Sequence, residues 1–150
     1  MKKLMCFTLL SMFLLSISYS QTITSSQQNE IDSVKNTIVE SYIEAIFIKA
    51  DTNLVKKGWH PECDISAIRN GNLMKGKTQY WIDRLKKEYK PIAPDVKYEF
   101  TEVKVTGYAA IAIIEIFIGN RHTYTDYIGL YKINGEWKII SKIFYTYPKN

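Results

Sequence analysis

The chain has 150 residues, 46% of them hydrophobic, and a formal net charge of +5 at pH 7. This length supports one domain with one hydrophobic core and excludes two. The basic residues are scattered and interleaved with acidic ones, whereas a nucleic-acid-binding surface carries a dense basic stripe on one side. We therefore expect no nucleic-acid partner.

The first twenty residues have the composition of a secretory signal peptide. Lys2 and Lys3 form a basic start, residues 4–17 an apolar run, and Ser18-Tyr19-Ser20 a small-x-small cleavage site. The apolar run is shorter than the ~20 residues that a bilayer-spanning helix needs. We predict a cleaved signal peptide over residues 1–20, export to a bacterial periplasm or the extracellular space, and no stable membrane anchor.

A long helix is predicted after the signal peptide. Residues 21–29 are mostly polar and are predicted to form a disordered lead-in. In residues 30–48 apolar side chains recur at steps of three and four, which places them on one helical face. This face carries Ile31, Val34, Ile38, Tyr42 and Ala45, and a second stripe carries Val39, Ile43 and Phe47. A helix with two apolar stripes is covered on most of its girth and belongs to the core.

Two shorter helices are predicted further along the chain. Asp51 or Thr52 can cap a second helix, which ends at Pro61 because the residue before a proline is pushed out of helical geometry. Thr78 is predicted to cap a third helix, which stops before Pro91. Both helices carry apolar residues at helical spacing, so both are expected to contribute to the core.

A short hairpin is predicted between these two helices. Residues 63–69 alternate between apolar and polar side chains, and Asn70-Gly71 is a strong turn signal. Residues 71–78 also match the phosphate-loop pattern G-x-x-x-x-G-K-T. A phosphate loop requires a buried parallel strand before it and a separate strand ending in an Asp that holds magnesium. The pattern of this chain indicates neither, so we interpret the match as chance.

Residues 96–147 have the pattern of a four-stranded antiparallel meander. Turn signals stand at Thr106-Gly107, Gly119-Asn120 and Asn134-Gly135. Three helices followed by consecutive antiparallel strands predict an α+β domain over residues 30–148, in which the helices pack on one face of a curved sheet.

The turns at Gly119-Asn120 and Asn134-Gly135 set the pairing of three strands and so sort their side chains by face. On the face assigned to the interior, this register places polar residues beyond an apolar floor. Buried carboxylates and phenols cost several kcal/mol unless they are paired or hydrated, so such a cluster typically lines a cavity. The alternatives are a bulge at Gly119 that turns one strand over, and polar groups satisfied at the rim of the sheet. The cluster comprises Glu115, His122, Tyr124, Asp126, Ser141 and Tyr145, and the floor includes Ile113, Ile128 and Ile143.

The opposite face of the predicted sheet is unusually apolar for a solvated surface. We predict that it forms a homodimer sheet to sheet, with scattered exposure or a covering segment of the chain as the alternatives. The apolar members of this face are Ile114, Ile116, Tyr127, Tyr131, Ile140 and Phe144, and Glu136, Lys138 and Lys142 lie among them.

Several of these segments together resemble a known family. They are residues 30–48, Trp59-His60-Pro61-Glu62, Tyr124-Thr125-Asp126-Tyr127, residues 132–139 and residues 142–144. They look like the nuclear transport factor 2-like (NTF2-like) superfamily and its "putative lumazine-binding", SnoaL-like branch. The resemblance covers nearly all of the chain after residue 20 and implies a conical pocket between a curved sheet and three helices, frequently in a dimer. Members include isomerases, dehydratases and polyketide cyclases, so it implies the fold rather than one activity.

The preferred functional prediction is a domain that binds a small apolar or aromatic molecule. Trp59 and His60 complete the predicted ligand-binding residues. No metal site is expected, since no His or Cys pair has zinc-like spacing, and no cofactor is predicted. The first alternative is a proton-transfer enzyme whose logic resembles ketosteroid isomerase. In it Asp126 or Glu115 is the base, and Tyr124 or Tyr145 donates a hydrogen bond to the developing oxyanion. The second alternative is a protein-interaction module that uses the apolar sheet face.

Overall fold

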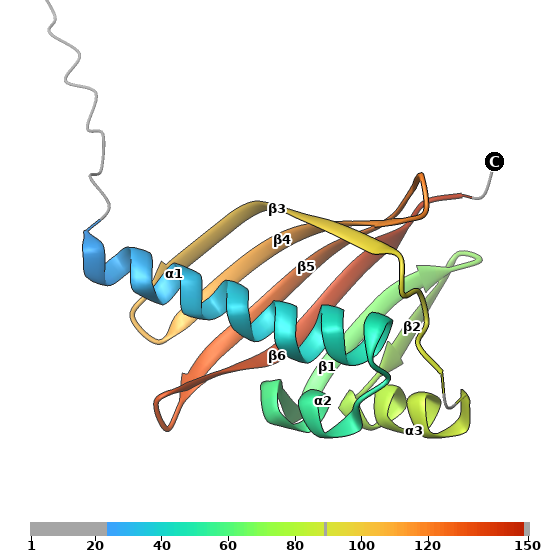
Figure 1. Cartoon of the computed structure of the whole chain (residues 1–150), viewed down its shortest axis with the longest axis horizontal. Helices are drawn as coiled ribbons and strands as arrows, with labels where there is room; N and C mark the ends of the chain where they lie inside the picture. The colour runs from blue at the N-terminus through green and yellow to red at the C-terminus, as the bar shows by residue number, and fades with distance from the viewer. Residues whose placement is uncertain (1–23, 89, 149–150) are drawn as a thin grey trace, which may run out of the picture.

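The structure is a computed structural model that describes residues 24–88 and 90–148. The predicted signal peptide lies outside the described residues. Within the described part, no helix is long and apolar enough to cross a membrane. Figure 1 shows the long N-terminal helix lying across the concave side of a curved sheet.

The long helix has two parts with different geometry. α1 (Ser25–Ile38) begins after Thr24, whose hydroxyl accepts a hydrogen bond from Gln27 N at 3.2 Å. The helix therefore starts earlier than predicted, and residues 25–29 are helical rather than a disordered lead-in. It continues as η1 (Val39–Ile48), a π-helix, in which backbone N–H groups bond to carbonyls five residues back.

The two shorter helices differ in detail from the sequence prediction. Asp51 caps α2 (Thr52–Gly58), and its Oδ1 accepts the backbone N–H of Asn53 at 2.8 Å. This helix ends at Gly58 instead of Pro61, because the chain then pairs with the sheet. α3 (Thr78–Glu88) starts at Thr78, whose hydroxyl donates to the His60 carbonyl at 2.6 Å. Thr78 thus joins α3 to the sheet rather than capping the helix.

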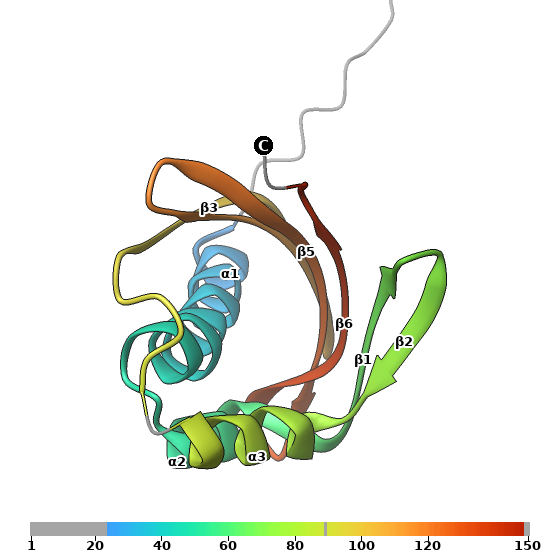
Figure 2. The same cartoon turned by 90° about the vertical axis from the view of Figure 1, so that its right-hand side faces the viewer.

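The predicted α+β fold and the predicted strands are confirmed. The strands are β1 (Trp59–Arg69), β2 (Asn72–Gly76), β3 (Val96–Thr106), β4 (Ala109–Ile118), β5 (Arg121–Ile133) and β6 (Glu136–Thr146). They form one mixed sheet in the order β2-β1-β6-β5-β4-β3, with β1 parallel to β6 and the other neighbours antiparallel. Figure 2 shows this sheet curving around α1 and η1, with α2 and α3 below and the β1–β2 hairpin projecting outward.

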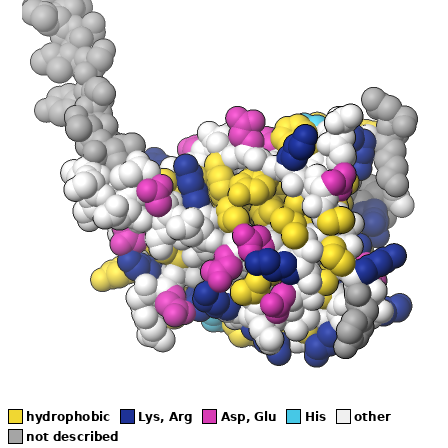
Figure 3. Space-filling model, viewed as in Figure 1, with side chains coloured by type: hydrophobic (Ala, Val, Ile, Leu, Met, Phe, Trp, Pro, Cys, Tyr) yellow, Lys and Arg dark blue, Asp and Glu magenta, His cyan; other side chains and the backbone are white. Residues whose placement is uncertain are grey.

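Apolar packing and one polar cluster hold the helix against the sheet. Val34, Ile38 and Ile43 are fully buried, and each such side chain contributes about 1.5–3 kcal/mol by leaving water. Glu30 of α1 accepts hydrogen bonds from Lys132 at 2.6 Å and from the Trp137 indole at 3.0 Å. Figure 3 shows hydrophobic side chains gathered near the middle of this view and bordered by charged ones.

Two β-bulges change which residues face the helices. Phe117 pairs with His122 as predicted, but Ile116 then pairs with Tyr124, so Thr123 is an extra residue in β5. In β6 the register shifts between Leu130↔Ile139 and Gly129↔Ser141, which leaves Ile140 as the extra residue.

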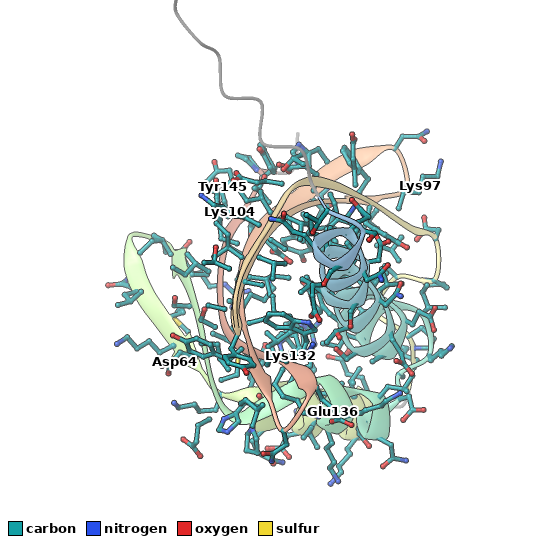
Figure 4. All side chains as sticks on the ribbon, turned by 90° about the vertical axis from the view of Figure 1, so that its left-hand side faces the viewer. Asp64, Lys97, Lys104, Lys132, Glu136 and Tyr145 are labelled. Atoms are coloured by element: carbon teal, nitrogen blue, oxygen red, sulfur yellow. The ribbon has the colours of Figure 1, made fainter. Side chains whose placement is uncertain are left out.

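The predicted faces are therefore wrong beyond each bulge, because one added residue reverses the alternation of side chains. Ile114 and Ile116 are fully buried on the helix side of β4, where Ile113 and Glu115 were expected. Figure 4 shows Lys132 within the curve of the sheet and Tyr145 outside it. The residues that move to the outer face are Ile113, Glu115, His122, Ser141, Ile143 and Tyr145, and those that move inside are Ile114, Ile116, Lys142 and Phe144.

Candidate functional site

A cavity of about 410 Å³ lies where the β1–β2 hairpin and α3 face η1 and the ends of β5 and β6. This volume is typical of small-molecule sites, which span about 300–1,000 Å³. Among the described residues that line it, none is acidic. Its aromatic and apolar lining includes Tyr42, Phe47, Met74, Trp81, Tyr124 and Phe144, and its basic residues are Arg69, Lys75, Arg84 and Lys142.

A buried ionic cluster stands at the inner wall of this cavity. Lys142 Nζ donates to Asp126 Oδ1 at 2.9 Å, and the Tyr42 hydroxyl donates to Asp126 Oδ2 at 2.5 Å. Asp126 is 0% exposed, and Lys142 and Tyr42 are each 1% exposed. Lys142 and Tyr42 line the cavity, whereas Asp126 lies behind them. Both oxygens of the carboxylate are thus occupied, and the lysine and the phenol are the groups that a ligand meets.

Burial shifts the protonation equilibria of this cluster. It lowers the pKa of Lys142 from the ordinary 10.5, against the opposing attraction of Asp126, because a buried ammonium loses its hydration. Burial and the neighbouring Asp126 charge raise the pKa of Tyr42 well above 10.0. Tyr42 therefore stays a neutral hydrogen-bond donor, while Lys142 is closer to its neutral, nucleophilic form than a surface lysine.

Local structure explains how a lysine comes to this position. The bulge at Ile140 turns Lys142 and Phe144 toward the helices, and Lys142 Nζ lies 3.7 Å above the centre of the Phe144 ring. In the π-helix, residues five apart come to neighbouring positions, and the Tyr42 and Phe47 rings pack edge to face 5.4 Å apart. The bulge and the π-helix thus bring these side chains together at the cavity.

The structure places four of the predicted ligand-binding residues at or behind the cavity wall. Tyr124 lines the cavity, and Asp126 is held by Lys142. Trp59 is 1% exposed behind Tyr42, with its indole donating to the Ser41 carbonyl at 3.0 Å. Ile128 is buried deeper in the core.

The other predicted residues lie elsewhere. His60 accepts the backbone N–H of Glu62 through Nδ1 at 3.2 Å, at the start of β1. Glu115 joins His122 on the outer face, with His122 Nε2 2.6 Å from Glu115 Oε2, and also accepts the Thr125 hydroxyl at 2.6 Å. Ile113, Ser141, Ile143 and Tyr145 share that outer face. The polar cluster predicted from the turns is thus divided between the two sides of the sheet.

Three residues at the inner wall of the cavity were absent from the predicted site: Tyr42, Lys142 and Phe144. Tyr42 was assigned to the core stripe of the helix, and the other two to the outer face. A signal for the second bulge exists in the adjacent pair Ile139-Ile140, because two consecutive large apolar residues break the alternation of a half-buried strand.

Comparisons with known proteins agree with this architecture. Residues 29–145 match the family described as "putative lumazine-binding". A protein from Cladobotryum sp named "Aldolase FrzH" is 34% identical over 128 residues, which cover 85% of this chain and 97% of that protein.

Solved structures with similar backbones are described as NTF2-like. The crystal structure of an NTF2-like protein of unknown function from Shewanella baltica has a TM-score of 0.69 at 22% identity, covering 85% of this chain and 100% of the other. A crystal structure from Streptomyces avermitilis, described as a putative dehydratase from the NTF2-like family, has a TM-score of 0.57 at 13% identity, covering 81% and 99%. At these identities the likeness shows the fold alone.

Proposed function

Because the chain belongs to the family described as "putative lumazine-binding" and has an NTF2-like fold, we propose that its cavity binds a small carbonyl compound and promotes proton transfer at the carbon next to the carbonyl group. The observation that carries this proposal is the buried cluster of Lys142, Asp126 and Tyr42 at the cavity wall. Solvent water takes up that proton, and its loss places negative charge on the carbonyl oxygen. A fixed hydrogen-bond donor in a largely apolar cavity stabilises such a charge strongly.

Each polar group of the site has a separate role in this proposal. Lys142 meets the carbonyl group of the ligand, and Tyr124 is a second donor in the same wall. Asp126 and Tyr42 are positioning residues, since Asp126 holds the ammonium from behind and the Tyr42 hydroxyl holds the Asp126 carboxylate. This assignment replaces the earlier hypothesis that Asp126 or Glu115 acts directly as the base, because Asp126 lies behind the wall and Glu115 is on the outer face.

The named relatives support a carbonyl substrate. An aldol reaction starts with loss of a proton, or of a carbon–carbon bond, next to a carbonyl group, and the relative at 34% identity is named an aldolase. Elimination of water beside a carbonyl passes through the same type of enolate, and one structural neighbour is described as a putative dehydratase. Both names fit a site that stabilises an enolate.

The residues that line the cavity indicate the chemical character of the ligand beyond its carbonyl group. Aromatic walls such as Phe47, Trp81 and Phe144 favour an apolar or aromatic body. The basic residues Arg69 and Lys75, with no acidic residue among the described lining, favour a negatively charged substituent.

Exchange of substrate protons for deuterium tests the proposal. Aromatic ketones and aldehydes, with and without a carboxylate, are incubated with the protein in D2O and followed by NMR. We expect Lys142→Met to slow the exchange of the preferred compound by about a hundredfold. Lys104→Met makes the same change on an exposed part of β3 and leaves the rate unaltered. Equal exchange in both folded variants contradicts the proposal.

Export and dimer formation are further parts of the proposal. The composition of residues 1–20 supports cleavage of a signal peptide, and N-terminal sequencing of protein recovered from the cell envelope or medium tests it. The apolar outer face of the sheet supports a homodimer. Tyr127 and Tyr131 are each 50% exposed there, and Ile143 is 60% exposed.

A further inference from the structure

We propose that Lys142 reacts covalently with the substrate, forming an imine with the carbonyl carbon of an aldehyde or ketone at the inner wall of the cavity. This inference rests on the proposed function and deepens it. A hydrogen-bond donor that stabilises an enolate needs no covalent bond to the ligand. In an imine, by contrast, the lysine nitrogen itself accepts the electron pair released from the neighbouring carbon.

Lys142 differs from the other described lysines in its surroundings. It is 1% exposed and lines a cavity, whereas Lys49, Lys57 and Lys77 pair with carboxylates at the surface. Among the described residues, Asp126 supplies its hydrogen-bond acceptor. This one hydrogen bond holds the Lys142 nitrogen in place, so the rest of the amino group is available to a ligand in the cavity.

The cluster contains the groups that imine formation requires. Asp126 takes a proton from the Lys142 ammonium, and the neutral amine attacks the carbonyl carbon, forming the C–N bond. The nitrogen passes one proton to the former carbonyl oxygen, Asp126 returns its proton to the nitrogen, and the nitrogen passes this second proton to the same oxygen. Water then leaves as the nitrogen lone pair forms the C=N bond. The products are one protonated imine, one water and the Asp126 carboxylate, so atoms and charge balance.

The protonated imine would be stabilised where it forms. Its positive nitrogen stays beside the Asp126 carboxylate and above the Phe144 ring, at the places now held by the ammonium. It accepts the electron pair released when the neighbouring carbon loses a proton or a carbon–carbon bond. Tyr42 keeps the second carboxylate oxygen occupied, which leaves Oδ1 aimed at the nitrogen.

The test uses 2,4-pentanedione, a diketone that condenses with a neutral lysine to give a stable vinylogous amide. We expect one adduct per chain, observed as a near-ultraviolet absorption band and an increase in intact mass, and mapped to Lys142 by peptide analysis. Lys142→Arg keeps the charge beside Asp126 and is expected to fold without forming the adduct. Lys104→Arg makes the same change on an exposed part of β3 and is expected to react like the wild type.

Two outcomes overturn the inference. One is folded wild-type protein that forms no adduct, and the other is adducts spread over surface lysines at equal rates in wild type and Lys142→Arg. The proposed function is judged separately by deuterium exchange. Exchange that depends on Lys142 without any adduct leaves the proposed function standing and refutes the covalent step, whereas absence of both refutes the two together.

Discussion

Lys142 and Asp126 are charged residues at positions from which water is excluded. Removing an ion pair from water is costly, and their mutual attraction and the Tyr42 hydrogen bond offset that cost only while all three are present. The cluster is therefore weak as a source of stability but sensitive to the loss of one partner. This balance agrees with the role that we propose for the pair in the cavity.

At the residue scale, Asp126→Asn should be strongly destabilising. It leaves the Lys142 ammonium buried without its counter-ion, and we expect the free energy of unfolding to fall by about 3–5 kcal/mol in urea titrations. Asp83→Asn is the control, because Asp83 is exposed on α3. The double variant Asp126→Asn with Lys142→Met should recover part of the loss. If Asp126→Asn were as stable as the control Asp83→Asn, the assignment of a buried ion pair would be contradicted.

The same cluster predicts how stability changes with pH. Burial lowers the pKa of Lys142 in the folded protein below 10.5, the ordinary value that applies to the unfolded chain. Between the folded and the unfolded pKa, the unfolded chain binds more protons at this lysine, so the free energy of unfolding rises with pH. Burial raises the pKa of Tyr42 above 10.0, so above that pH the unfolded chain loses a proton that the folded chain keeps, and stability falls.

Urea titrations between about pH 7 and pH 11 measure both effects. The difference in unfolding free energy between wild type and Lys142→Met should increase toward pH 10.5, the ordinary pKa of lysine. Tyr42→Phe should reduce the decline at the alkaline end. A difference that is constant across the whole range would refute the assigned protonation states.

At the scale of elements, the contact between α2 and η1 depends on a glycine. A Cβ added to Gly58 would lie 2.0 Å from Ser41 Oγ and 2.2 Å from Ser41 Cβ, in the π-helix that carries Tyr42. Close packing at this point therefore sets the position of one cavity wall. The Ser41 hydroxyl is itself fixed, since it donates to the Thr37 carbonyl at 2.6 Å.

We expect Gly58→Ala to destabilise the fold by about 1–3 kcal/mol through overpacking, measured as a lower midpoint of thermal unfolding. Adding Ser41→Gly removes the clashing side chain, so the double variant should be more stable than Gly58→Ala alone. Gly71→Ala is a poor control because Gly71 has a positive φ of 76°. Ala109→Gly, at the exposed start of β4, serves instead as the control, because it measures the effect of exchanging alanine and glycine at a position without close packing.

At the scale of the whole molecule, the two faces of the curved sheet differ. The inner face is covered by the helices and borders the cavity, whereas the outer face exposes apolar side chains to solvent. Tyr127 and Ile143 are cross-strand partners at the outer side, and both are at least half exposed. An apolar group of this kind is typical of an association surface. The fold thereby separates the cavity from the proposed dimer contact.

We expect the double variant Tyr127→Lys with Ile143→Lys to shift the protein from dimer to monomer in light scattering after gel filtration, because opposed surfaces would then carry like charges. Leu73→Lys makes a similar change on the exposed side of β2 and should leave the mass unaltered. A wild type that is monomeric at all concentrations would contradict the dimer.

The sequence by itself determined the elements and their class, through signals that act over a few residues. The apolar stripe from Ile31 to Ala45 identified the long helix. Two hairpins were identified by their turn pairs, Asn70-Gly71 and Asn134-Gly135, and all four of these residues have positive φ values in the structure. The predicted register next to Asn134-Gly135 was also correct, with Trp137 opposite Lys132 and Ile139 opposite Leu130. These features follow from backbone geometry that the local residues impose.

The tertiary structure decided which side chains meet in the cavity. The extra residues Thr123 and Ile140 reverse the faces of the strands beyond them, and bulge positions depend on how neighbouring strands pair and curve around the helix. Lys142 thus moved from the predicted outer face to the wall of the cavity, while Glu115 moved out. A single added residue in a strand exchanges one face for the other, so strand positions could be predicted without predicting the site.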